Sequence, residues 1–164
     1  MAASPCPGCG AEFPDREGPV HRYMESSPAC WAAYGEVLAR EYSDPAYYRV
    51  HRFSVDSYAV QHPGRPSSQA IQSVNLHLIR LCCLLEKSLP MEKANDLMQA
   101  ATEQKERYVW LTPPASLGEV TVKEVHAALD VEEHLAAVIR WADSAWRAWT
   151  PHHQTVRSLI PKIY

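Results

Sequence analysis

Apolar side chains recur at steps of three and four residues between positions 67 and 90, and this period constrains the fold more than any other feature of the chain. The repeat consists of Ile71, Val74, Leu78, Leu81 and Leu85. Residues with this spacing lie on one face of an α-helix. Ser67 or Ser68 precedes the repeat and Pro90 follows it, as is typical of the start and the end of a helix. The pattern therefore predicts an amphipathic helix that buries its apolar face.

Helical patterns cover most of the chain after residue 27. We expect further helices over residues 28–42, 45–62, 91–108 and 131–149, a short helix after Thr121, and a last helix from Thr150 to Leu159. Residues 109–120 contain two prolines and a glycine, which predicts a loop. The predicted fold class is all-α, a helical bundle of about five or six helices.

Charge and composition exclude several classes of partner. The 164 residues are 46% apolar and carry a net charge of −3, from 16 Lys and Arg against 19 Asp and Glu. Such a chain offers no basic surface for a phosphate backbone, so we expect no nucleic-acid partner. The sequence has no run of about 20 apolar residues and does not open with a basic and then apolar leader, so we expect no membrane partner and a cytoplasmic location.

Three of the five cysteines lie within the first 30 residues. Cys6 and Cys9 form a Cys-x2-Cys pair, a spacing that lets two thiols bind one metal ion. Tetrahedral zinc needs two more ligands, and the nearest suitable donors downstream are His21 and Cys30. We therefore predict a structural Zn2+ site formed by Cys6, Cys9, His21 and Cys30, which four protein ligands close to water and substrate.

Two other interpretations of these cysteines stay open. In one, the segment is a flexible tail and Cys30 is simply buried on a helix beside Trp31. In the other, Cys6 and Cys9 are a redox pair, although such pairs usually follow a strand and no strand pattern precedes Cys6. With zinc, we expect residues 1–30 to form a knuckle arm packed on the body and residues 31–164 to form one helical bundle, because the arm is too short and polar for its own core.

Eight histidines are more than solubility requires. His51 and His62 fall on one line of the predicted 45–62 helix, but about 16 Å separates them along its axis, so they cannot share one metal ion. A site that uses His62 must draw its other groups from different helices. The candidate catalytic residues are His62, Asp56 and His77, with His62 as a base or metal ligand and Asp56 orienting it.

Further polar residues are candidates for ligand binding between helices. They are His51, Tyr58, His152 and His153. A second divalent metal ion, held by His62, His77 and His153 from facing helices, is the corresponding metal hypothesis. For each lone histidine the alternative is an ordinary hydrogen-bonded interior or surface residue, and the tryptophans near the C-terminal histidines can equally pack the end of the bundle.

Two stretches carry a resemblance to known proteins. The segment Cys6-Pro7-Gly8-Cys9-Gly10 and the stretch VHRFSVDSYAVQHPG at 50–64 are similar to a family of uncharacterised bacterial proteins, a domain of unknown function. The resemblance covers most of the chain and implies a bacterial origin and a compact single unit, without an activity. A looser similarity in architecture relates the chain to the small helical-bundle metalloproteins of the DinB type, but no stretch matches their motif, so no ligand is transferred.

Three functional hypotheses follow. The first is a non-catalytic zinc protein whose helical bundle binds a small molecule or a protein partner. The second is a metal-assisted or acid–base enzyme with a histidine-rich site between helices. The third, a transcription-associated or toxin–antitoxin-like regulator, lacks a basic recognition helix. The first hypothesis accounts best for the cysteines.

Overall fold

The computed structural model describes residues 2–162, and within them helices account for almost all of the regular structure. In chain order the elements are β1 (Ala3–Pro5), β2 (Glu12–Pro14), α1 (Pro28–Ser43), α2 (Pro45–Tyr48), α3 (His51–Gln61), α4 (Ser68–Leu81), a π-helical turn (Cys82–Glu86), α5 (Met91–Ala101), a 3-10 turn (Thr102–Arg107), α6 (Val122–His126), α7 (Val131–Ala148), a second 3-10 turn (Thr150–His152) and α8 (His153–Leu159). The predicted all-α class is confirmed.

Side-chain caps set the starts of the long helices. The hydroxyl of Ser27 accepts a hydrogen bond from the Cys30 amide at 3.1 Å at the start of α1, and Ser67 accepts one from the Ala70 amide at 3.0 Å at the start of α4. Asp130 caps α7 in the same way. Each cap satisfies an amide that has no partner within its own helix.

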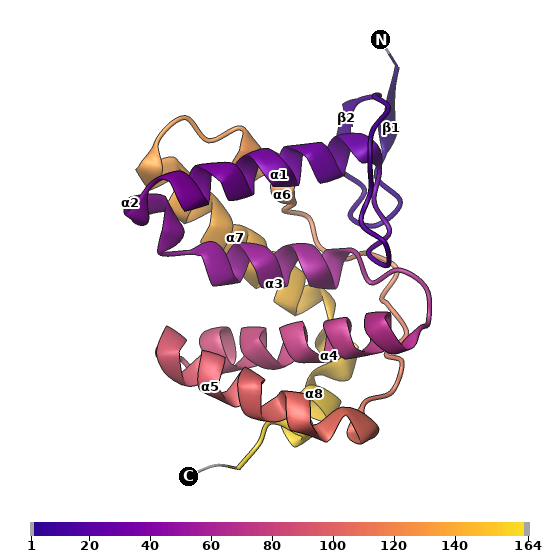
Figure 1. Ribbon diagram of the computed structural model, residues 1–164, viewed down its shortest axis with the longest axis vertical. Coiled ribbons are helices and arrows are strands. Elements are labelled where there is room, and N and C mark those ends of the chain that lie inside the picture. Colours follow the sequence, from indigo (N-terminus) through magenta and orange to yellow (C-terminus); the bar gives the residue numbers. More distant parts are fainter. Residues whose placement is uncertain (1, 163–164) are drawn as a thin grey trace.

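The helices form two halves that meet along α3 and α4. In the view of Figure 1, α1, α3, α4 and α5 lie one below another, with α7 behind them. Helix α3 packs on both α4 and α7, while α1 packs on α6 and α4 packs on α5. The segment before α1, residues 2–27, is called the N-terminal arm below. It contains the antiparallel β1–β2 pair and extends from the start of α1 to the connection between α3 and α4 (Figure 1).

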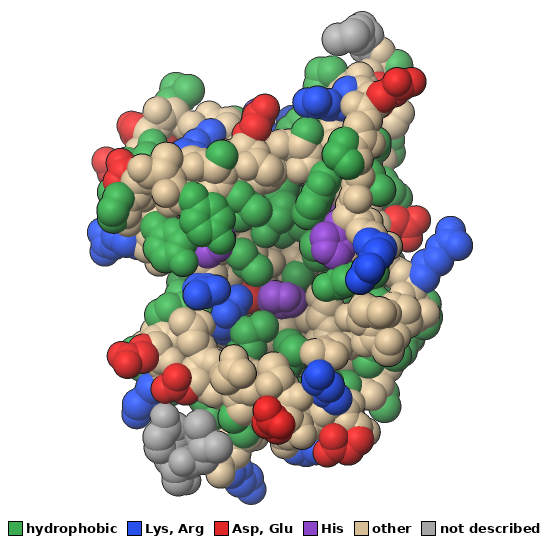
Figure 2. All heavy atoms as spheres, in the orientation of Figure 1, with side chains coloured by type: hydrophobic (Ala, Val, Ile, Leu, Met, Phe, Trp, Pro, Cys, Tyr) green, Lys and Arg blue, Asp and Glu red, His purple; other side chains and the backbone are tan. Residues whose placement is uncertain are grey.

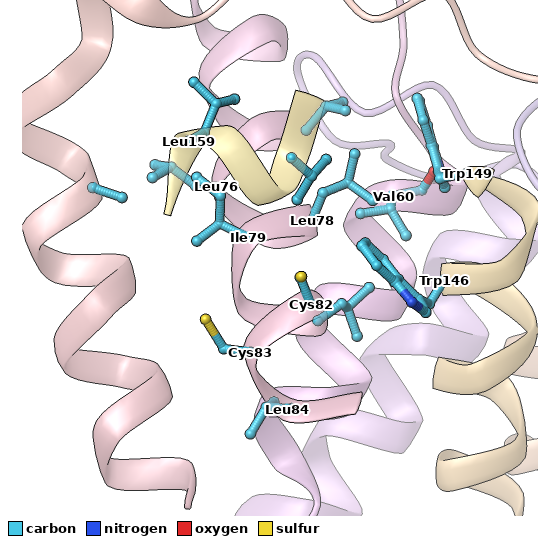
Figure 3. Close-up of a cluster of buried hydrophobic side chains, with 14 of the residues drawn as sticks. Val60, Leu76, Leu78, Ile79, Cys82, Cys83, Leu84, Trp146, Trp149 and Leu159 are labelled. Carbon is cyan, nitrogen blue, oxygen red and sulfur yellow. The ribbon is translucent and has the colours of Figure 1, made fainter. Parts of the chain in front are cut away.

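The larger apolar core lies around α4 and receives side chains from α3, α5, α7 and α8. Figure 3 shows Trp146 and Trp149 directed from the end of α7 toward α4 and Val60. The indole N–H of Trp149 donates to the backbone carbonyl of Val60 at 3.0 Å. Cys82 and Cys83 are fully buried in this core, and burial raises the pKa of Cys82 to about 12 and that of Cys83 to about 11. They are inert apolar residues at neutral pH.

The structure divides three of the helices expected from the sequence. The 45–62 segment is interrupted at Val50, where φ is −107° and ψ is 7°, and the 91–108 segment continues beyond Ala101 as a 3-10 turn. The 150–159 segment begins as a 3-10 turn, and α8 starts only at His153. The Thr150 hydroxyl donates backwards to the Arg147 carbonyl at 2.5 Å. These changes follow from local backbone hydrogen bonding that an apolar period does not reveal.

The two strands were not expected. β1 ends at Pro5, directly before Cys6, so a strand precedes this cysteine although the sequence shows no strand pattern there. Each strand has three residues, and β1 is exposed throughout. Strands this short contain no alternation of apolar and polar residues that a sequence can display.

Among residues 2–162, none of the helices has both the length and the apolar character that crossing a membrane requires.

Candidate metal centre

Four side chains from three parts of the chain meet where the N-terminal arm reaches the helical body. They are Cys6, Cys9, Cys30 and His62, and their ligand atoms all lie within 4.8 Å of one another. The Nε2 atom of His62 is 3.5 Å from the sulfur of Cys6 and 3.5 Å from that of Cys30. The sulfurs of Cys9 and Cys30 are 3.7 Å apart.

These distances fit the edges of a tetrahedron around one zinc ion. With Zn–S bonds of about 2.3 Å and Zn–N bonds of about 2.0–2.1 Å, a regular tetrahedron places two sulfurs about 3.8 Å apart and a sulfur and a nitrogen about 3.6 Å apart. The observed separations of 3.7 and 3.5 Å agree with both edges. The four atoms are therefore arranged so that one metal ion could bind all of them.

A tight backbone turn places the first two sulfurs. The Gly10 amide donates to the Cys6 carbonyl and the Cys6 amide donates to the Ala11 carbonyl, both at 2.9 Å. The turn also passes very close to the body, since a Cβ atom on Gly8 would lie 2.5 Å from the His62 ring and 2.6 Å from the Glu25 carbonyl. Glycine at this position is what allows the arm to approach the histidine.

The third sulfur belongs to the first turn of α1. The cap formed by Ser27 fixes this turn and orients Cys30 toward the arm. The amide of Ser27 in turn donates to the Cys6 sulfur at 3.4 Å. An amide directed at a sulfur stabilises its thiolate form, as is usual for the groups that surround metal ligands.

His62 follows the last residue of α3 and completes the group. Its Nδ1 atom lies 2.7 Å from the carbonyl of Tyr58, which accepts an N–H and leaves the lone pair of Nε2 available for a metal. The Tyr58 ring stacks on the imidazole at 3.8 Å, and its hydroxyl lies 3.5 Å from the Cys30 sulfur. Tyr58 therefore orients two of the ligands.

Electrostatics inside the group favour a cation at its centre. Hydrogen bonds from Cys30 and Cys9 lower the pKa of the Cys6 thiol. The pKa of Cys9 is raised by its hydrogen bonds to Cys30 and Cys6, and the pKa of Cys30 is raised to about 12, chiefly by its hydrogen bond to Cys6. Three thiolates at this separation repel one another, whereas a divalent cation lets all three ionise.

His21, the expected fourth ligand, lies outside the group, and His62 stands in its place. The Nδ1 atom of His21 accepts the amides of Tyr23 and Met24, each at 3.2 Å, and its ring packs edge-on against those of Tyr23 and Trp31. Burial and the charge of Arg22 lower its pKa. A neutral His21 thus stabilises the backbone turn of the arm.

The structure separates His62 from the other two candidate catalytic residues, which contact each other. Asp56 is fully buried and contacts His77, whose Nδ1 atom lies 2.7 Å from the carboxylate. Arg80 donates to the same carboxylate from Nε at 2.8 Å and from Nη2 at 2.6 Å. Asp56 therefore orients His77, which lies one turn of α4 from Arg80. The expectation that Asp56 orients His62 is wrong.

His51 belongs to a separate polar network, in which His51, Glu41 and His134 are buried and Arg40 is half-buried. Its Nδ1 atom lies 3.0 Å from one carboxylate oxygen of Glu41, and His134 Nε2 lies 2.9 Å from the other. Because Arg40 donates to His134 Nδ1 at 3.1 Å, the proton of a neutral His134 is on Nε2 and points at Glu41. The network joins α1, α3 and α7, which is a structural role for His51.

The two C-terminal histidines each contact a backbone carbonyl. The Nε2 atom of His152 lies 2.8 Å from the Thr112 carbonyl. The Nε2 atom of His153 lies 2.8 Å from the Trp146 carbonyl, and its ring stacks on Trp146 at 3.7 Å. The His153 contacts attach α8 to the end of α7, and the His152 contact attaches the turn before α8 to the loop at 109–120. The pairing of His153 with Trp146 is packing.

In residues 2–162 the four-residue group is the one place where three or more potential metal ligands come together. The structure therefore does not bring His62, His77 and His153 together as a ligand set. A helix end followed by Pro63 and Gly64 is the sequence signal that distinguishes His62, but it does not reveal which part of the chain that helix end meets.

Comparison with known proteins identifies the family and adds no activity. No curated protein and no solved structure matches the chain. One family model, described as a family of unknown function (DUF5946), matches residues 4–150. The matched residues include the whole Cys3His group and helices α1 to α7. The chain therefore belongs to the DUF5946 family.

Proposed function

We propose that the Cys3His group binds one zinc ion as a structural centre, and that the helical body held by this centre binds a small ligand or a protein partner. The observation that carries the proposal is the tetrahedral spacing of three sulfurs and one imidazole nitrogen. Sulfur and imidazole ligands in a tetrahedron favour zinc over magnesium or calcium, which prefer oxygen.

The burial of the ligands supports a structural role for the ion. Cys30 and His62 are fully buried, Cys6 is 3% exposed and Cys9 is half-buried. Four protein ligands fill a tetrahedral coordination sphere, so no position is left for water or substrate. Catalytic zinc sites keep such a position open. The ligands are also held by neighbouring polar groups. The Ser27 amide contacts the Cys6 sulfur and the Tyr58 hydroxyl contacts the Cys30 sulfur.

The N-terminal arm buries too little surface to be ordered by packing alone, and a zinc centre would supply the missing stabilisation. Few residues of the arm are buried, and Cys6, Ala11 and Ser26 are the ones below one-tenth exposure among those described. So little buried surface does not offset the conformational entropy of ordering the segment. A zinc ion joins the arm to the start of α1 and the end of α3, and its binding energy then contributes directly to folding.

Metal analysis together with hydrogen exchange tests this proposal. We expect one zinc ion per purified chain, and its loss in Cys6→Ser. Removal of zinc with a chelator should release amide protection first in residues 2–27, with α4 and α7 protected longer. Cys82→Ser is the matched control, because it removes a buried thiol from the apolar core and should leave one zinc ion per folded chain. A metal-free chain with a protected arm contradicts the proposal.

The proposal includes a cytoplasmic location and excludes nucleic acid and membranes as partners. Zinc-bound thiolates persist where the surroundings keep cysteines reduced. The net charge of −3 disfavours binding to polyanions.

An acid–base enzyme is the second candidate function, and the contact between His77 and Asp56 favours it. A buried carboxylate at 2.7 Å from Nδ1 fixes the tautomer of the imidazole, and the side chain is 19% exposed. A histidine oriented in this way can accept or donate a proton at Nε2. Hydrolysis of a panel of activated esters and phosphate esters tests this role: activity that disappears in His77→Gln supports it, and activity that is unchanged contradicts it.

A further inference from the structure

The face shown in Figure 2 is hollowed between the half formed by α1 and α3 and the half formed by α4 and α5. Basic, acidic and histidine side chains adjoin one another in this hollow (Figure 2). A cavity of about 280 Å3 lies between α3, α4 and α5. Its lining consists of Arg52, Arg80, Asn95, Met98, Gln99 and Thr102.

Arg80 is fixed by hydrogen bonds to Asp56 and Asn95, but some of its N–H donors have no acceptor within residues 2–162. It is 5% exposed, and a guanidinium carries five N–H groups. Its bonds to Asp56 use one N–H on Nε and one on Nη2, and its bond to Asn95 at 3.1 Å uses one on Nη1. One N–H on each Nη atom remains without an acceptor among residues 2–162. A buried cation that lines a cavity with two such donors is prepared to bind an oxygen ligand.

The charge around the cavity favours an anion. Asp56 offsets the charge of Arg80, but Arg52 on α3 is a second cation in the lining. None of the six lining side chains is acidic. Asn95 and Gln99 on α5 and Thr102 on the 3-10 turn that follows it add polar groups. The cavity therefore has one excess positive charge together with neutral hydrogen-bonding groups.

We propose that this cavity binds a small ligand through an oxyanion group, a carboxylate or a phosphate ester, held by Arg80 and Arg52. Arginine is suited to this role because its planar N–H groups match the two oxygens of such an anion. The volume of about 280 Å3 is just below the range of about 300–1,000 Å3 that is typical of ligand pockets, so the ligand is a compact one. This assignment rests on the proposed function, in which the helical body binds a small ligand, and it gives the chemical class of that ligand.

Asp56 and His77 fix the position of Arg80 in this site. The Asp56 carboxylate does not itself contact the ligand. Asp56 holds the guanidinium by two of its nitrogens and is itself held by His77. The position of Arg80 is thus set before a ligand arrives, which lowers the entropy that binding must offset. Asp56 is a positioning residue in this account.

Titration of the full chain with inorganic phosphate and, separately, with acetate tests the inference by amide NMR at constant ionic strength. We expect saturable shifts of Asn95 and Gln99 for at least one anion. Phosphate alone identifies a phosphate ester and acetate alone a carboxylate, while both anions indicate recognition of the shared oxyanion. No saturable shift of these amides at millimolar concentrations overturns the inference.

Arg52→Gln and Arg65→Gln form a matched pair, because both residues are exposed. Arg65 precedes the start of α4, whereas Arg80 lies near its end, so Arg65 does not line this cavity. Arg52→Gln should weaken binding at least about fivefold, since it removes a charged donor, and Arg65→Gln should leave it unchanged. Equal effects of the two changes, or none from Arg52→Gln, overturn the inference. Zinc content measured on the same samples shows separately whether the metal proposal holds.

Discussion

The imidazole nitrogen Nε2 of His62 lies 3.5 Å from the sulfur of Cys6, although 56 residues separate them in the sequence. The contact joins the end of α3 to the turn between the two strands. Cys30 on α1 lies at the same distance from His62. A metal ion bound there links the N-terminal arm, α1 and the end of α3, so changes near it should affect both metal affinity and stability.

Gly8→Ala tests the close approach of the arm. A Cβ atom at this position would lie 2.5 Å from the His62 ring and 2.6 Å from the Glu25 carbonyl, so the turn must move away from the histidine. We expect zinc affinity to fall by at least about tenfold, because small displacements of ligands and their supports have effects of this size. Competition with a chromophoric chelator measures it.

Gly35→Ala is the control for this change. Gly35 lies in α1, and a Cβ atom there would meet nothing within 4 Å. Alanine should therefore keep full zinc affinity and stabilise the helix by about 0.5–1 kcal/mol. Equal zinc affinity in Gly8→Ala and Gly35→Ala would contradict the proposed geometry of the turn.

Tyr58→Phe removes the hydroxyl that lies 3.5 Å from the Cys30 sulfur and keeps the ring that stacks on His62. A phenol donates to a thiolate, so its loss should weaken zinc binding by about 10- to 100-fold, as is typical for groups that support metal ligands. Tyr42→Phe changes a tyrosine that is 67% exposed and should have no effect. The same chelator competition distinguishes the two variants, and equal affinities would show that the hydroxyl does not support the centre.

Much of the site could be predicted from the sequence, but not its fourth member. Cys6 and Cys9 are three residues apart, so a local turn suffices to bring them together, and Cys30 follows the capping residue Ser27 in a recognisable helix start. His62 reaches the group only because α3 packs beside α1. His21 is nearer in sequence, yet its nitrogen is used by the amides of Tyr23 and Met24. Tertiary packing, which spacing does not encode, selects the ligand.

The helices also show which features a sequence pattern predicts and which depend on local geometry or tertiary packing. The apolar repeat of α4 predicts both its existence and its buried face, because the period is long and regular. The interruption at Val50 depends on local backbone geometry, and the pairing of Asp56 with His77 depends on α3 lying against α4. Neither feature leaves a period in the sequence.

Glu41→Gln tests the buried network of α1, α3 and α7. Glu41 accepts from His51, His134 and, at 2.5 Å, from the Ser54 hydroxyl. Burial acts to raise the pKa of Glu41, but these donors outweigh it and the pKa is lowered. Removing one member of a buried charged network destabilises a protein by about 3–5 kcal/mol, and urea unfolding at neutral pH should show a loss of this order.

The pH dependence of this loss has a definite sign. A carboxylate whose pKa is lowered in the folded state stabilises the fold at pH above its unfolded value of about 4.3, and this contribution disappears as the pH falls through the folded value. The stability difference between the wild type and Glu41→Gln should therefore be largest near neutral pH and shrink in acid. A difference that grows below pH about 4 would contradict the ionised state of Glu41.

Asp56→Asn should be far more damaging than the loss of an exposed ion pair. It leaves the buried Arg80 without its partner, and we expect a loss of about 3–5 kcal/mol. Arg157→Gln breaks the pair with Glu86, in which the two side chains are 47% and 32% exposed, and should change stability by less than about 1 kcal/mol. Chemical unfolding of both variants checks this order, and similar losses would mean that Asp56 is not an essential partner.

Zinc content in His62→Asn and His21→Asn tests the central claim most directly. Both changes replace an imidazole with an amide, but only His62 lies with the three cysteines. The account predicts less than one tightly bound zinc ion in His62→Asn, with residues 2–27 losing protection, and one zinc ion with a protected arm in His21→Asn. Full zinc content in His62→Asn together with loss of zinc in His21→Asn would contradict it.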